Sequence, residues 1–160
     1  MRYILRQKYF TIRDGFTVTN EYGQGVFRVE GKLISLGKKF RLYDMGGREL
    51  FYIKQRLFRW FKRYDFIQNG ERVALIKRKP AIFCKRFKIK TDDGEILRVK
   101  GAWHSFSFHI VDENDNELAY ISKKVLKIAD TYTVDVQDQR RTPLIMAIAI
   151  VMDAIYHRRH

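Results

Sequence analysis

The feature that most constrains the fold of this chain is a repeated turn signal. Short clusters of Asn, Asp and Gly supply the left-handed backbone positions that tight hairpins need. Successive clusters are spaced 22 to 24 residues apart, a period that corresponds to two strands, one tight turn and one connector. The clusters are Asn20–Gly23, Asp44–Gly47, Gln68–Glu71, Asp92–Glu95 and Asn114–Glu117.

The segments that flank these turns alternate between apolar and polar residues, as half-buried strands do. Phe106, Phe108 and Ile110, for example, alternate with polar side chains. Five hairpins give ten strands, and an opening strand near 2–8 and a closing strand near 131–137 raise the number to twelve. Closure is the arrangement that removes exposed sheet edges. The pattern therefore predicts a mainly β protein, a closed twelve-stranded antiparallel β-barrel.

The pattern changes abruptly near the C-terminal end, where Thr142-Pro143 is typical of a helix start. Every residue from Leu144 to Met152 is apolar, and a helix that is apolar on all sides must lie in a membrane or in a core. A bilayer span needs about 20 apolar residues, so we expect a core helix that fills the barrel rather than a tail anchor. We predict a single domain over 1–160, with barrel strands in 1–138 and a central helix over 142–157.

Buried positions follow from this interpretation of the helix. Residues that point in different directions around it should all be nearly free of solvent: Leu144, Ile148, Val151 and Ile155. Asp153 is the exception to the apolar character, and a buried carboxylate needs a hydrogen bond or an ionic partner. We expect Asp153 to meet polar or basic groups at the mouth of the barrel rather than to act in catalysis.

Several short segments stand in an order and spacing typical of one protein family. They are Gln7-Lys8, Val29–Lys32, Ser35–Gly37, Tyr43-Asp44, Ile53–Gln55, Ile121–Lys124, Asp130–Tyr132 and the apolar helix with Asp153. Together they resemble the LURP-one-related family over essentially the whole chain. The resemblance implies a fold similar to the C-terminal domain of Tubby proteins and to phospholipid scramblases, a barrel around a hydrophobic helix. Tubby domains bind membrane phosphoinositides, but no residues of their head-group site align with this sequence.

Charge is the most informative functional feature of the sequence. The chain carries a formal net charge of +14, which attracts polyanions without selecting among nucleic acid, anionic lipid and acidic proteins. Acidic residues concentrate in the turns and basic residues in the connectors, so one end of the barrel should be acidic and the other basic. The candidate anion- or lipid-binding residues are Arg56, Arg59, Lys62, Arg63, Lys77, Arg78, Lys79, Lys85 and Arg86.

Aromatic residues between these cations suggest what they bind. Phe58, Trp60 and Phe61 stand in one basic connector, and Ile82 and Phe83 in another. Cations around exposed aromatic side chains suit an anionic lipid surface, and stacking on single-stranded nucleic acid uses the same residue types. An alternative is that these aromatic side chains tuck under the connectors as additional core.

Motifs for catalysis are not found. The segment Gly31–Lys38 superficially suggests a phosphate-binding loop, but it has five residues between its glycines, and 40–43 read as a strand rather than a helix. No Gly-x-Ser-x-Gly elbow is present. Because no nucleophile, base and orienting group can be assembled, we do not expect an enzyme or a cofactor.

Metal and thiol chemistry are similarly unsupported. His104 and His109 fall on opposite faces of a predicted strand, and His157 and His160 stand in a terminal tail, so we expect no metal site. Cys84 has neighbouring cations that would favour its thiolate, but no partner base is identifiable. A single Cys suits a reducing compartment, and the charged N-terminal segment does not resemble an export signal.

The sequence therefore predicts a non-enzymatic binding or scaffold protein, cytoplasmic and peripheral to the membrane. The favoured ligand is anionic phospholipid, bound through the basic rim of the barrel. A module that binds nucleic acid or an acidic protein is the alternative, and an enzyme of unrecognised type is a second one.

Overall fold

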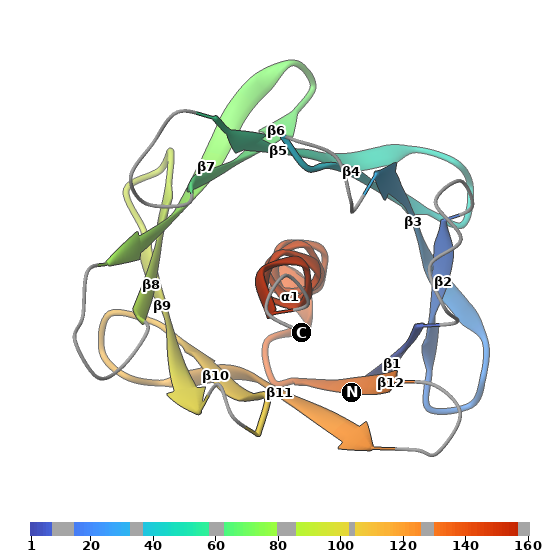
Figure 1. Cartoon of the computed structure of the whole chain (residues 1–160). Helices are drawn as coiled ribbons and strands as arrows, with labels where there is room; N and C mark the ends of the chain where they lie inside the picture. Colours follow the sequence, from blue (N-terminus) through green and yellow to red (C-terminus); the bar gives the residue numbers. More distant parts are fainter. Residues whose placement is uncertain are drawn as a thin grey trace.

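The chain forms a closed barrel of antiparallel strands around one helix (Figure 1). The computed structural model describes residues 1–7, 15–32, 37–57, 63–79, 86–102, 105–125 and 130–156. The strands are β1 (Arg2–Gln7), β2 (Phe16–Asn20), β3 (Gly25–Lys32), β4 (Lys39–Asp44), β5 (Glu49–Arg56), β6 (Arg63–Gln68), β7 (Glu71–Lys79), β8 (Arg86–Thr91), β9 (Ile96–Ala102), β10 (Ser107–Val111), β11 (Glu117–Val125) and β12 (Asp130–Val136). A 3₁₀ turn (Gln139–Arg141) and the helix α1 (Thr142–Tyr156) follow β12.

Each strand pairs with its neighbours in sequence, and the ring closes where β12 pairs with β1. At this seam Leu5 faces Tyr132, and Arg2 faces Asp135, to which it is also ion-paired. Closure leaves no strand of the sheet without two partners, which removes the edges that an open sheet would expose. The predicted closed barrel of twelve antiparallel strands is confirmed for the described part of the chain.

The five predicted turns all join consecutive strands at the same end of the barrel, which we call the turn end. At the second turn, Gly47 has φ +86° and its N–H donates to the carbonyl of Asp44 at 3.1 Å. That backbone conformation is accessible to glycine without a steric penalty. The opposite end, where β5 leads toward β6 and β7 toward β8, is the connector end.

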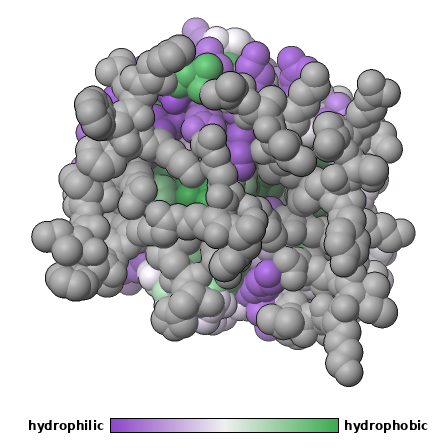
Figure 2. Space-filling view, viewed as in Figure 1, coloured by the Kyte–Doolittle hydropathy of each residue, from purple (hydrophilic) through white to green (hydrophobic). Residues whose placement is uncertain are grey.

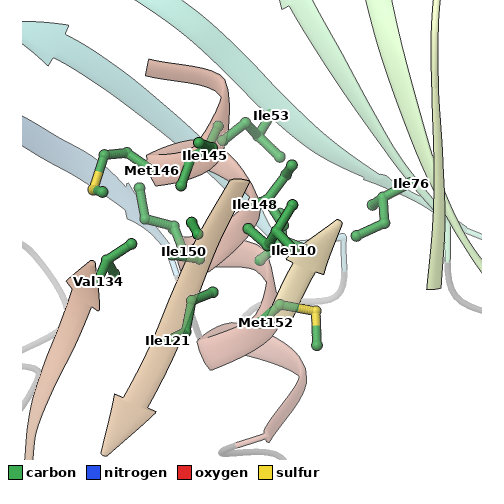
Figure 3. Packing of buried hydrophobic residues seen from close by; sticks show 14 of the residues in the cluster. Ile53, Ile76, Ile110, Ile121, Val134, Ile145, Met146, Ile148, Ile150 and Met152 are labelled. Atoms are coloured by element: carbon green, nitrogen blue, oxygen red, sulfur yellow. The ribbon is translucent and has the colours of Figure 1, made fainter. Parts of the chain in front are cut away.

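The barrel interior is filled by α1 and by the inward side chains of the strands. Isoleucines from β5, β7, β10 and β11 surround the helix in Figure 3. Ile148 and Val151 are fully buried and Ile155 is 5% exposed, which confirms a core helix. Leu144 is only partly buried, contrary to expectation, because it lies in the first turn, where the helix enters the barrel. Among the described residues, no helix combines the length and apolar character that a bilayer span requires.

The helix is fixed at both ends by contacts that the sequence did not predict. Thr142 is not a conventional cap, since its hydroxyl donates to the carbonyl of Gln139 at 2.8 Å. Asp138 caps the preceding 3₁₀ turn through the N–H of Arg140. At the other end, the buried ammonium of Lys38 donates to the carbonyl of Ala154. A cation at this position also interacts favourably with the negative end of the helix dipole.

Candidate anion-binding surface

Three of the predicted anion-binding residues lie next to one another near the connector end. Arg56 is the last residue of β5, Arg63 is the first residue of β6, and Lys77 lies in β7. The strand register places Arg56 opposite Arg63, and Arg63 opposite Lys77. Opposed residues in an antiparallel pair have Cβ atoms about 4.5 to 5.5 Å apart. These residues therefore form one row of positive charge across three strands.

The other six candidates are located less completely. Lys79 and Arg86 are opposed in the register of β7 and β8, whereas Arg78 is opposite Phe87. Only the backbone positions of these three residues are described. Arg59, Lys62 and Lys85 lie outside the described residues, as do the apolar residues 58, 60, 61, 82 and 83. All six described candidates belong to strands rather than to connectors, so the positive charge extends from the rim onto the barrel wall.

The row of cations continues beyond the candidates predicted from the sequence. Lys88 of β8 lies opposite Lys77, and Arg98 of β9 lies opposite Lys88. The alternation of Phe87 and Ile89 with Lys88 indicated the orientation of that lysine, but only the register shows which cations it neighbours. Like charges directly opposite one another destabilise a sheet. A multivalent anion would relieve this repulsion.

Asp65 partly neutralises the start of the row. Its carboxylate lies 2.7 Å from the guanidinium of Arg56, and its side chain is only 5% exposed. Two atoms nearby, Asp65 Oδ1 and Arg63 Nε, are buried without a hydrogen-bond partner among the described residues. The carboxylate of Asp65 is therefore close to several cations of the row, and the net charge of this part of the barrel remains positive.

The turn end contrasts with this surface because its carboxylates are ionised and held by local partners. The side chain of Asn116 donates to Asp112, and the Thr91 hydroxyl donates to Asp93; these hydrogen bonds hold the pKa of each carboxyl below its ordinary value of 3.8. The side chain of Asp115 accepts from Lys100, which lowers the pKa of that carboxyl as well. The carboxylates of the turn end are therefore held by neighbouring polar or basic side chains.

A shallow depression on the other side of the barrel carries both signs of charge. Residues of β1, β10, β11 and β12 line it, including Arg2, Glu117 and Asp135. His109 lies there with its Nδ1 against a Glu117 carboxylate oxygen. Because cations and carboxylates are paired with one another in this depression, it is less suited to an anionic ligand than the row on β5 to β9.

The residues considered for other chemistry are placed as follows. Lys39–Asp44 is strand β4, as predicted, so the segment after Gly37 does not open a helix as a phosphate-binding loop would. No group of three or more His, Cys, Asp or Glu in the described part of the chain could hold a metal ion. Asp153 is 5% exposed, in the same helical turn as the carbonyl that Lys38 binds. Outside the described residues lie Cys84, His104, His157 and His160.

Figure 2 views the barrel along its axis, in the orientation of Figure 1. A hydrophobic patch shows near the middle, where the interior lies, and hydrophilic residues show above it and toward the edges. A closed barrel of antiparallel strands with an apolar helix inside defines the structural class of this protein.

Comparison with known proteins assigns the family. The family model described as LURP-one-related matches residues 1–153, so the chain belongs to the LURP-one-related family. The chain is similar to the uncharacterized protein YxjI of Bacillus subtilis (strain 168), with 29% identity over 153 residues that cover 96% of this chain and 92% of that protein.

The fold is similar to that of the Arabidopsis thaliana protein AT5G01750, solved by X-ray crystallography. The TM-score is 0.66 at 18% sequence identity, and the match covers 96% of this chain and 90% of that one. At this identity the likeness concerns the fold alone.

Proposed function

We propose that this protein is a non-enzymatic, peripheral binding protein for anionic phospholipid surfaces. The observation that carries the proposal is the row formed by Arg56, Arg63 and Lys77, in which cations from three strands are opposed near the connector end. Juxtamembrane cations contribute about 1 kcal/mol each near an anionic surface. A row of several cations therefore supplies enough free energy for reversible binding without a dedicated pocket.

The charges at the two ends of the barrel give the proposed binding a direction. The ionised Asp93, Asp112 and Asp115 at the turn end would be repelled by an anionic surface. The connector end, where Arg63 and Lys77 lie and where Asp65 pairs with Arg56, would be attracted. The protein would thus approach the membrane with its connector end, and no catalytic group is needed for that role.

Vesicle co-sedimentation of the whole protein tests this proposal. Vesicles of phosphatidylcholine should not bind the protein, whereas vesicles with about 30% phosphatidylserine should bind it, and salt should weaken the binding because it screens exposed charges. Arg63→Gln/Lys77→Gln should weaken binding by about 2 kcal/mol. Arg48→Gln/Arg140→Gln, which removes the same charge from the turn end, is the matched control.

Two results would contradict the proposal. Equal binding to neutral and anionic vesicles would mean that the cations do not direct the interaction. If the protein does not bind vesicles but shows salt-dependent binding to an oligonucleotide or to an acidic protein, the cationic surface binds one of those alternative ligands instead.

A further inference from the structure

The cations of the barrel wall differ in whether they have an acidic partner. Two cations near the turn end are paired: Arg98 with Asp115, and Arg141 with Glu95. Among the residues of β4 to β8 whose side chains are described, in contrast, Arg41 and Arg56 form ion pairs and seven other cations form none with a described carboxylate. Six of these are Lys39, Lys54, Arg63, Lys77, Lys88 and Lys90, and Arg72 lies toward the other end of β7. We call these seven residues the basic wall.

The register places the cations of the basic wall on adjacent strands, and Asp65 of β6 lies among them, opposite Lys54. Lys39 lies opposite Lys54, and Lys77 lies opposite both Arg63 and Lys88. Strands are spaced about 4.8 Å apart, so five adjacent strands span about 19 Å. Opposing so many like charges across a sheet costs stability. The arrangement is accounted for most simply by a ligand that is anionic across a comparable width.

The remaining side chains of this wall favour a lipid surface over a nucleic acid. Half-buried apolar residues lie between the cations, with Leu75 next to Lys90 in the register and Ile67 on β6. Apolar side chains among cations suit the boundary between head groups and acyl chains. Single-stranded nucleic acid needs open aromatic platforms, but the guanidinium of Arg41 already lies 4.9 Å from the ring centroid of Tyr52.

The residue types lead to the same conclusion. Five of the seven cations are lysines, which act as flexible point charges, whereas arginine provides the planar, bidentate geometry of specific phosphate recognition. Lysines therefore fit a surface in which many phosphate or carboxylate groups are mobile, such as an anionic bilayer.

We infer that the basic wall on β4 to β8 is the face that lies against the anionic membrane, so that the barrel docks on its side rather than on its connector end alone. This inference rests on the proposed function and specifies its geometry. The connector-end cations Arg63 and Lys77 belong to the wall, and the wall continues along β8 to Lys90, near the turn that follows at 92–95.

The test uses lysines of the wall other than the pair replaced above, and Lys90 is the one nearest the turn end. Lys54→Gln/Lys88→Gln/Lys90→Gln should weaken binding to vesicles with about 30% phosphatidylserine by about fivefold per lysine, or about a hundredfold in total. The matched control removes three cations at the turn end, Arg2→Gln/Arg48→Gln/Arg140→Gln, and leaves the same net charge. It should bind within about twofold of the unmodified protein, since none of these three residues belongs to the basic wall.

The outcomes separate this inference from the proposed function. If the unmodified protein does not bind anionic vesicles, the proposed function fails and the inference fails with it. If the unmodified protein binds, but the wall variant binds as tightly as the turn-end control, the barrel docks end-on and only the inference is overturned. Unchanged melting temperatures in both variants establish that any loss of binding is not a loss of fold. Should a variant be unstable, Lys54→Gln/Lys90→Gln, at two exposed positions, should still lose about 25-fold.

Discussion

Replacing Ile148 by Ala measures how much the central helix contributes to the barrel. Ile148 is fully buried within α1, inside the ring of strands. The substitution removes three carbon atoms at about 0.8 kcal/mol for each buried methylene, or about 2.4 kcal/mol of transfer free energy. The closed barrel cannot collapse easily around the helix, so a cavity term adds to this, and we expect a total loss of about 3 to 4 kcal/mol.

The assay is denaturant and thermal unfolding of the whole chain. For a protein of this size each kcal/mol lowers the melting temperature by about 3 °C, so the Ile148→Ala protein should melt about 10 °C lower. Leu144→Ala is the control on the same helix, because Leu144 is only partly buried and should lose clearly less. A loss below about 1 kcal/mol for Ile148→Ala, or equal losses for the two variants, would refute a tightly packed interior.

Two further substitutions test the contacts at each end of the barrel. Lys38→Met should reduce the free energy of unfolding by about 2 kcal/mol, because it removes a charge-assisted hydrogen bond to the helix. Lys39→Met, on the outer face, is the control and should change the free energy of unfolding by less than about 0.5 kcal/mol. Equal effects of the two substitutions in denaturant unfolding would contradict the role of Lys38. Asn116→Ala removes the side-chain donor that lowers the pKa of Asp112 in the folded protein. A carboxyl with a lowered native pKa stabilises the folded state fully at pH values above its ordinary pKa of 3.8, and this stabilisation is lost as the pH falls through the lowered native value. Melting temperatures between about pH 6 and pH 2 should therefore fall less steeply in Asn116→Ala than in the unmodified protein, while Asn114→Ala, whose side chain is not that donor, should retain the original slope.

The sequence predicted the architecture because the relevant signals are local. A turn such as Asp44–Gly47 specifies its own backbone geometry, and alternation then assigns the flanking residues to the inside or outside. The apolar run after Thr142 specified a helix without a solvent face. The sequence did not predict where the ends of that helix contact the barrel, as the partial exposure of Leu144 illustrates.

The binding surface was less predictable because it depends on the register between strands. Arg63 and Lys77, for example, are opposed in a register that shifts between Phe66 and Ile67. Sequence reasoning placed the cations in connectors, whereas much of the charge lies on the wall. The contact of Lys38 with the helix was not predicted, although alternation places Lys38 on the same face of the strand as Phe40. A lysine next to another lysine is ordinarily expected to be exposed to solvent.

The order of the segments along the chain has a consequence for folding. The ring closes only when β12 reaches β1, and the helix that fills the ring follows β12 in the sequence. Contacts between such distant segments slow folding, since the loop entropy is lost before the contacts form. On the ribosome, eleven strands would be made with their apolar faces uncovered before the seam or the filling existed. A chain that ends before residue 142 should therefore remain incompletely folded and aggregate, and formation of the helix is the last step that stabilises the closed barrel.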